Sequence, residues 1–221
     1  MKTLIDNYKL IYPKIPVTDV NGSIVVEEPD NLGNPTKFQS LEINGINGFA
    51  FDHYLAKNMS SFAQIASPAT FYISGDQWDN ILYDDCDRII LFEKNGQKYM
   101  LFCELKSGYS TDQIFHARCQ LLGSYIKMKG LMSTVRGFTE NDFIPIGLIV
   151  SFESTAEQRD YYSKKQGFEA SFVRQLDKAK KFDIIGNKSQ VPFNYRDFRI
   201  YHCGVPNMKV NYSIDINTII P

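Results

Sequence analysis

Several short patterns that mark common active sites are missing from this chain of 221 residues. It contains no Gly-x-x-x-x-Gly-Lys phosphate loop, no Gly-x-Gly-x-x-Gly turn, no His-Glu-x-x-His pair and no Gly-x-Ser-x-Gly elbow. Histidine is also scarce, and its three copies, His53, His116 and His202, are scattered along the sequence. These absences leave no support for a phosphate-loop enzyme, a dinucleotide-binding enzyme, a zinc peptidase or a Ser/His/Asp or Cys/His nucleophile.

Cysteine is rare and irregularly spaced. The four cysteines are Cys86, Cys103, Cys119 and Cys203. They form no Cys-x-x-Cys pair and have no histidine pair nearby, so neither a zinc site nor an iron–sulfur site is indicated. Reduced cysteines are the default, and small buried thiols in a cytosolic core explain Cys86, Cys103 and Cys119 more simply than catalysis does.

The chain has almost no net charge and no long apolar run. Its 24 basic and 25 acidic residues give a formal net charge of −1, so any nucleic-acid surface must be local. No stretch approaches the ~20 apolar residues of a membrane span. The start of the chain carries Asp6, Lys9 and Lys14 and has no long apolar block, which argues against a signal peptide. We expect a cytoplasmic protein without membrane contact.

Two apolar runs surround an Asn-Gly pair near the middle of the chain. They are Ile89–Phe92 and Tyr99–Cys103, on either side of Asn95-Gly96. Asn-Gly between hydrophobic runs is the strongest short-range signal for a two-residue hairpin turn. Continuous apolar runs are typical of strands buried on both faces. A surface ribbon with solvated ends is a poorer explanation, because acids at the ends of buried strands lie at the rim of a core, where unpaired charge is costly.

The turn determines which residues of the hairpin face each other. With Asn95-Gly96 as the loop, Asp87 falls opposite Glu104, and strand alternation puts Lys106 on the same face. Like charges directly opposite each other destabilise a sheet. A divalent cation such as Mg²⁺ or Mn²⁺, whose preferred ligands are carboxylates, would compensate them.

This arrangement resembles the PD-(D/E)xK, or restriction-endonuclease-like, nuclease superfamily over roughly residues 50 to 152. Asp87 matches the motif aspartate, Glu104 the motif acid and Lys106 the motif lysine. The chain is most similar to the RecB-like branch, whose next helix carries a glutamine and then a tyrosine four residues on. Gln120 matches that glutamine, but Tyr125 follows it by five residues.

The resemblance implies a fold, a metal and a set of roles. The fold is an α/β restriction-endonuclease-like core, α-β-β-β-α-β, with a mixed central sheet flanked by helices and with accessory N- and C-terminal strands. Mg²⁺ or Mn²⁺ would be held by Asp87 and Glu104, with Asp52 as a further acid from the first core helix. Lys106 and Gln120 would complete the catalytic set. A solvated Asp52 near a helix start is an equally good interpretation of that residue.

The remaining sequence predicts one domain, residues 1–221, built around this core. The 43% hydrophobic content is enough for a full core. Residues 1–47 are predicted to be an extended, turn-rich lead-in, 48–152 the core, and 153–221 C-terminal helices and strands. Within the core we expect a helix from Phe49 to Ala66, a strand from Ala69 to Ser74, a loop from Gly75 to Asn80, a helix capped at Ser110-x-x-Gln113, and a buried strand from Phe143 to Phe152.

Basic residues gather in the region after the core, which is predicted to begin a helix at Ser154-x-x-Glu157. Four of them, Arg174, Lys178, Lys180 and Lys181, are the best local candidates for nucleic-acid phosphate contacts. A solvated helix face would have a similar composition, and neighbouring acids dilute the charge. Both interpretations stay open.

Together these observations predict a metal-dependent nuclease that hydrolyses phosphodiester bonds in nucleic acid, with DNA favoured over RNA. One alternative is a non-catalytic nucleic-acid-binding or protein-assembly module that keeps the nuclease fold. Another is an unrelated α/β interaction domain in which the acids and the lysine fall into this spacing by chance. Assembly as a homodimer is left open.

Overall fold

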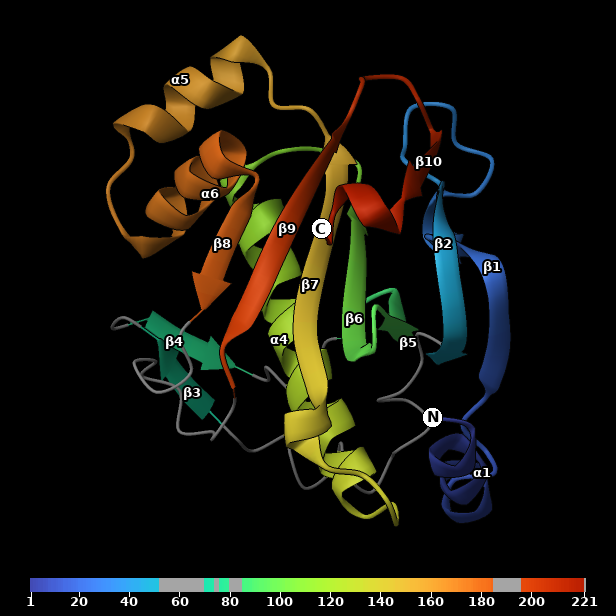
Figure 1. Cartoon of the computed structure of the whole chain (residues 1–221). Coiled ribbons are helices and arrows are strands. Elements are labelled where there is room, and N and C mark those ends of the chain that lie inside the picture. Colours follow the sequence, from blue (N-terminus) through green and yellow to red (C-terminus); the bar gives the residue numbers. More distant parts are fainter. Residues whose placement is uncertain (52–69, 74–75, 80–84, 185–195, 221) are drawn as a thin grey trace.

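The computed structural model describes residues 1–51, 70–73, 76–79, 85–184 and 196–220. In these ranges the chain forms a mixed eight-stranded sheet flanked by helices, together with a small two-stranded sheet (Figure 1). The helices and strands are α1 (Lys2–Ile11), β1 (Val17–Glu27), β2 (Ser40–Phe51), β3 (Thr70–Ile73), β4 (Asp76–Asp79), β5 (Arg88–Lys94), β6 (Gln97–Lys106), α4 (Thr111–Ser133), β7 (Phe143–Phe152), α5 (Ala156–Lys164), α6 (Phe168–Ala179), β8 (Lys181–Ile184), β9 (Phe198–Val205) and β10 (Asn211–Asp215). Short 3₁₀ helices are η1 (Pro29–Asn31), η2 (Glu140–Asp142) and η4 (Ile216–Thr218).

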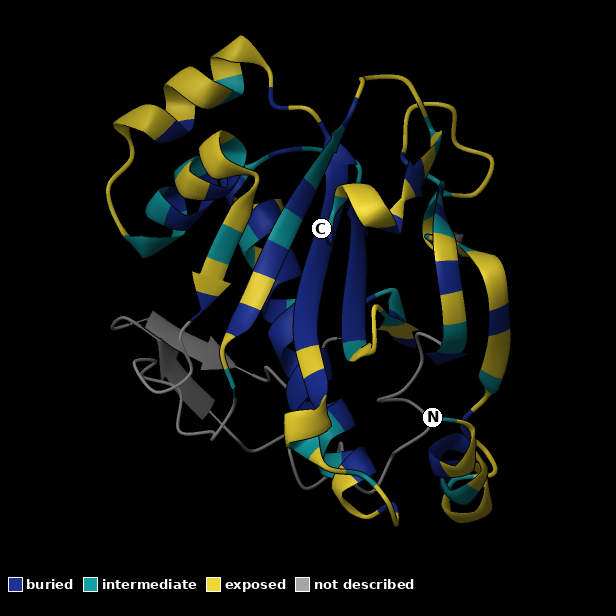
Figure 2. Ribbon diagram, viewed as in Figure 1, coloured by how far each residue is buried: buried dark blue, intermediate teal, exposed yellow. Residues whose placement is uncertain are grey.

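The large sheet has the strand order β1-β2-β5-β6-β7-β9-β8, and β10 pairs with part of β2. Strands β6, β7 and β9 are parallel, whereas β1, β2, β5 and β6 are antiparallel neighbours. Figure 2 shows that β6 and β7 are buried over most of their length. The carboxyl ends of the three parallel strands therefore meet at one edge of a well-packed sheet.

The predicted hairpin is confirmed. Asn95 and Gly96 have φ values of 51° and 73°, and a two-residue type I′ turn requires positive φ at both positions. The register runs from Lys94 opposite Gln97 to Arg88 opposite Cys103, as the turn predicts. The Asn-Gly pair thus fixes how the two most informative strands align.

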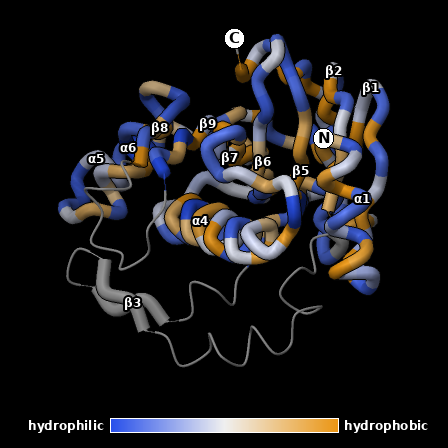
Figure 3. The backbone as a smooth tube through the Cα atoms, turned by 60° about the horizontal axis from the view of Figure 1, so that its bottom comes forward, coloured by the Kyte–Doolittle hydropathy of each residue, from blue (hydrophilic) through white to orange (hydrophobic). Residues whose placement is uncertain are grey.

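Helix α4 is also confirmed, and it lies along one face of the sheet (Figure 3). Ser110 caps it, with its hydroxyl accepting from the Gln113 N–H at 3.2 Å. Its predicted apolar stripe, Ile114, Ala117, Leu121, Tyr125 and Met128, is buried. Burial of each large apolar side chain contributes about 1.5–3 kcal/mol. Gly147 of β7 permits this packing, because a Cβ there would lie 2.9 Å from a Leu121 methyl carbon.

The strand predicted over Phe143–Phe152 is β7, with the predicted bounds. It is buried because β6 and β9 pair with its two edges and side chains cover both of its faces. Pro145, which lacks an N–H, precedes Ile146, the first β7 residue paired with β9. Cys86, Cys103 and Cys119 are buried, as expected, whereas Cys203 is partly buried.

The prediction for the amino-terminal part is wrong in two respects. Residues 2–11 form α1, whose Leu4, Ile5 and Tyr8 bury one helical face, rather than an extended lead-in. Phe49–Phe51, predicted to begin a helix, instead end β2 and pair with β5. A short apolar run suits a buried strand as well as a buried helix, and here sheet pairing decides. The rest of that predicted helix lies outside the described residues.

The strand predicted over Ala69–Ser74 exists in part as β3, but it is not a strand of the core sheet. It pairs with β4, which lies within the segment predicted to be a loop. In the core sheet, the strand that pairs with β5 on the side away from β6 is β2. Pairing partners depend on tertiary contacts, which a local apolar pattern cannot specify.

The carboxyl-terminal helix begins one residue later than predicted. The cap of α5 is Thr155, which forms a capping box with Gln158, whereas Ser154 donates to Asp177 Oδ1 at 3.0 Å. No helix in the described ranges is both long and apolar enough to span a membrane.

Candidate metal centre

The four residues predicted as catalytic lie together at the carboxyl end of β6. Glu104 and Lys106 are on β6, Asp87 immediately precedes β5, and Gln120 is on α4. The Asp87 N–H donates to Glu104 Oε2 at 3.2 Å. Lys106 Nζ donates to Gln120 Oε1 at 2.8 Å and also to Glu104 Oε1. The hairpin, the helix and the segment before the hairpin thus converge on one site.

Asp87 and Glu104 are interlocked through each other's backbone. While the Asp87 N–H donates to Glu104, the Leu105 N–H donates to Asp87 Oδ2 at 2.6 Å. The strand ladder ends one step earlier, at Arg88 opposite Cys103. Beyond the last paired residues, the two carboxylates accept the backbone N–H groups in place of carbonyls of the opposite strand. These hydrogen bonds hold both acids at the strand ends.

Gln120 links Lys106 to the segment before β5. Its Oε1 accepts from Lys106, and its Nε2 donates to the Asp85 carbonyl at 3.1 Å. An ammonium group can only donate and a carbonyl can only accept, so the two contacts fix the orientation of the amide. Gln120 thus holds the lysine and the segment in one geometry.

Burial makes negative charge unfavourable at both acids. Glu104 has no solvent exposure, and burial raises its pKa to about 7 although the Lys106 ammonium acts in the opposite direction. Burial also raises the pKa of Asp87 well above its usual value, and the charges of Glu104 and Glu28 raise it further. A cation bound between the acids would relieve this cost.

Glu28 is a third acid near the site, and sequence reasoning missed it. It follows β1, and its charge raises the pKa of both Asp87 and Glu104. Its loop is docked on the residue after Lys106, because Ser107 Oγ accepts from the Phe38 N–H at 2.9 Å and from Asn31 Nδ2 at 3.2 Å. No local pattern around Glu28 indicates this folding back. Asp52, the acid predicted for this role, lies outside the described residues.

Two polar residues of α4, Ser124 and Lys127, were also missed. Both contact the segment before β5: the Cys86 N–H donates to Ser124 Oγ at 2.8 Å, and Lys127 forms an ion pair with Asp85. Their signal in the sequence is helical spacing, since they follow Gln120 by four and seven residues along an otherwise buried face.

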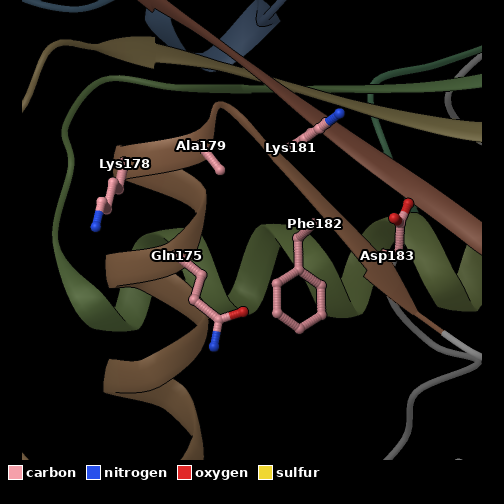
Figure 4. Close-up of a pocket in the computed structure, with 6 residues that line it drawn as sticks. All are labelled: Gln175, Lys178, Ala179, Lys181, Phe182 and Asp183. Carbon is pink, nitrogen blue, oxygen red and sulfur yellow. The ribbon is translucent and has the colours of Figure 1, made fainter.

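The predicted phosphate-binding residues lie around α6 and β8, and they do not form one cluster. Arg174 donates to the carbonyls of Tyr162 and Lys165 at 2.7 and 2.6 Å, which holds the end of α5. Lys180 pairs with Asp177 at 3.3 Å. The exposed Lys178 and Lys181 line a pocket of about 410 Å³ beside Phe182, and their ammonium groups point in different directions (Figure 4).

Comparison with known proteins identifies no relative: no family model, curated protein or solved structure matches the chain. Among the residues that the structure describes, no group of three or more His, Cys, Asp and Glu side chains is arranged to hold a metal ion. The pair formed by Asp87 and Glu104 is the part of the site with the ligand chemistry of a hard cation, because its donors are carboxylate oxygens.

Proposed function

We propose that the protein is a metal-dependent nuclease that hydrolyses phosphodiester bonds of nucleic acid, with DNA as the favoured substrate. The observation that carries this proposal is the interlocked pair of Asp87 and Glu104, with Lys106 bound to Glu104 at the end of the same strand. This is the set of groups, in the hairpin register, that the resemblance to PD-(D/E)xK nucleases requires.

The order of elements around the site supports the same proposal. Strands β2, β5 and β6 are antiparallel neighbours, α4 crosses one face, and β7 returns parallel to β6. This β-β-β-α-β order agrees with the core that the resemblance to restriction-endonuclease-like nucleases implies. The chain adds β1 and β10 beside β2, adds β9 and β8 beyond β7, and carries β3 and β4 between β2 and β5.

The charge of the site favours Mg²⁺ or Mn²⁺. Four carboxylates, Glu28, Asp85, Asp87 and Glu104, and two ammonium groups, Lys106 and Lys127, lie within this network, which gives a formal net charge of −2 when all are ionised. Such a site would repel a phosphodiester. A divalent cation held by Asp87 and Glu104 would cancel that charge, polarise the phosphate and activate water.

Lys106 and Gln120 would have separate roles in the reaction. Lys106, whose side chain is 16% exposed, would leave Glu104 to contact a phosphate oxygen or a water molecule. Its charge would then stabilise the negative charge that develops on the phosphoryl oxygens. Gln120 would keep the ammonium group in place, because it also holds the backbone of Asp85.

A non-catalytic module with the same fold is the second candidate, and one contact favours it. Lys106 neutralises Glu104 directly, so a lysine already supplies a positive charge beside the buried acid. A protein that had lost its metal could keep this ion pair for stability alone and retain a surface for nucleic acid or for another protein.

A cleavage assay separates the two candidates. The purified protein is incubated with single- and double-stranded DNA and RNA, with Mg²⁺, with Mn²⁺ and with a chelator. We expect metal-dependent cleavage of DNA that the chelator stops and that Glu104→Gln removes, because the substitution deletes a ligand charge while nearly keeping its shape. Binding of Mn²⁺ without cleavage of any substrate would favour the non-catalytic module.

A further inference from the structure

The segment that carries Asp87 has no strand ladder of its own. Strand β5 begins at Arg88, so Asp85, Cys86 and Asp87 precede the first paired residue. Cys86 is buried. A segment of this kind must be fixed by contacts outside the sheet if Asp87 is to present its carboxylate in one position.

Helix α4 supplies those contacts from three side chains on one line. Gln120 Nε2 donates to the Asp85 carbonyl at 3.1 Å, Ser124 Oγ accepts from the Cys86 N–H at 2.8 Å, and Lys127 pairs with the Asp85 carboxylate. Residues spaced four and three apart share one face of a helix. The three side chains therefore hold consecutive groups of the same segment.

The pair formed by Lys127 and Asp85 joins a buried lysine to a partly buried aspartate. Its side chains are 1% and 14% exposed. A lysine is almost never buried this deeply unless it is paired, and a charge pair shielded from water interacts more strongly than one on the surface. Lys127 is too enclosed to meet a nucleic-acid phosphate in solvent, so its contacts within the protein, which include the ion pair with Asp85, are the best guide to its role.

We propose that Lys127 is a positioning residue for the metal site. Through Asp85 it fixes the segment 85–87, so that Asp87 keeps its hydrogen bond from the Leu105 N–H and its place beside Glu104. Asp85 is the anchor for Lys127 and is not itself a metal ligand. The consequence for metal binding rests on the proposed function, whereas the consequence for the geometry of Asp87 does not.

The test uses the double variant Asp85→Asn with Lys127→Met, which removes both charges and leaves neither buried without a partner. Calorimetry should show Mn²⁺ affinity reduced by at least about 10-fold, as for other residues that orient metal ligands. The matched control is Lys129→Met. Lys129 lies on the same helix and pairs with Glu140 at 3.0 Å, so its loss should leave Mn²⁺ affinity unchanged.

Amide hydrogen exchange measured on the metal-free protein provides a second readout. The Leu105 N–H, which donates to Asp87, should exchange faster in the double variant and at the wild-type rate in Lys129→Met. If the double variant does not fold, Ser124→Ala replaces it, because this substitution removes the acceptor for the Cys86 N–H and changes no charge. We expect a smaller increase in the exchange rate of the Leu105 N–H in this variant.

The two readouts separate failure of this inference from failure of the proposed function. A wild-type protein that binds no Mn²⁺ contradicts the metal site, but exchange at Leu105 still reports on Lys127. Wild-type exchange at Leu105 in the folded double variant, or in Ser124→Ala where the double variant does not fold, would overturn the positioning role. So would wild-type Mn²⁺ affinity in a folded double variant.

Discussion

Lys106 makes two contacts that would change when a cation binds. It donates to Glu104 and to Gln120, so its charge lies against a group that we propose as a metal ligand. A cation at the same carboxylate would be repelled by the ammonium group. Lys106 is thus expected to assist the reaction while opposing metal binding, whereas Glu104 should favour both.

Replacement of Lys106 by Ala tests whether this lysine assists cleavage while opposing metal binding. We expect Lys106→Ala to lower cleavage by about 10²- to 10³-fold, the usual loss when one group that stabilises developing charge is removed. Mn²⁺ affinity, measured by calorimetry, should be kept or increased. Lys98→Ala is the control, because Lys98 lies at the other end of β6 and pairs with Asp142. Full cleavage by Lys106→Ala would show that the lysine has no catalytic role.

His202 is a buried histidine on the strand next to β7. Ser151 Oγ donates to the Phe152 carbonyl at 2.9 Å, so its contact with His202 Nε2 at 2.9 Å requires the ring nitrogen to donate. Nδ1 then carries a lone pair, and it has no hydrogen-bond partner among the described residues. Burial lowers the pKa of His202 to about 3, and the nearby Lys180 charge contributes.

This pKa predicts acid sensitivity. The pKa of His202 in the folded protein lies below the 6.5 of an unfolded chain, so between these values only the unfolded chain binds the proton. The contribution of neutral His202 to the free energy of unfolding is therefore complete above pH 6.5 and is lost as pH falls towards 3. His202→Gln should remove up to about 5 kcal/mol of this pH dependence. Urea unfolding across this pH range is the measurement, with the exposed His116→Gln as the control. Equal slopes in wild type and His202→Gln would contradict the assignment.

At the scale of elements, the junction of α6 and β8 is the remaining candidate surface for nucleic acid. Lys178 and Lys181 are exposed and flank one pocket, and Lys180 lies between them with a positive φ of 57° (Figure 4). Arg174 belongs to a different group, because its two hydrogen bonds hold the end of α5. Binding and stability should therefore respond to different substitutions in this region.

Replacing Lys178, Lys180 and Lys181 together by Ala should weaken nucleic-acid binding. Each phosphate contact that is lost should reduce the slope of log affinity against log salt by about 0.9 on double-stranded DNA. Arg174→Ala should instead lower stability and leave the salt slope unchanged. A triple variant with the wild-type slope would place the binding surface elsewhere.

The elements that could be predicted from the sequence are those with strong local signals. The hairpin has the Asn95-Gly96 turn, α4 has its Ser110 cap and apolar stripe, and β7 has a continuous apolar run. The errors involve elements whose state depends on distant partners. Phe49–Phe51 belong to β2 because β5 pairs with them, and β3 lies outside the core sheet because β4 is its partner.

At the scale of the whole molecule, the candidate site was predictable only where its residues lie on one supersecondary unit. Asp87, Glu104 and Lys106 follow from the hairpin register, and Gln120 follows from the next helix. Glu28 reaches the site because the loop after β1 docks on Ser107, at the edge formed by the parallel strands. No local pattern in the sequence records that contact.

The central claim is that Asp87 and Glu104 hold a divalent cation. Its most direct test is a crystal of the wild-type protein soaked in Mn²⁺, with anomalous difference density measured at the manganese absorption edge. We predict a peak about 2 Å from a carboxylate oxygen of each residue, and no peak there in Glu104→Gln. Wild-type crystals with no anomalous peak between these two carboxylates, or with manganese bound only elsewhere, would contradict the claim.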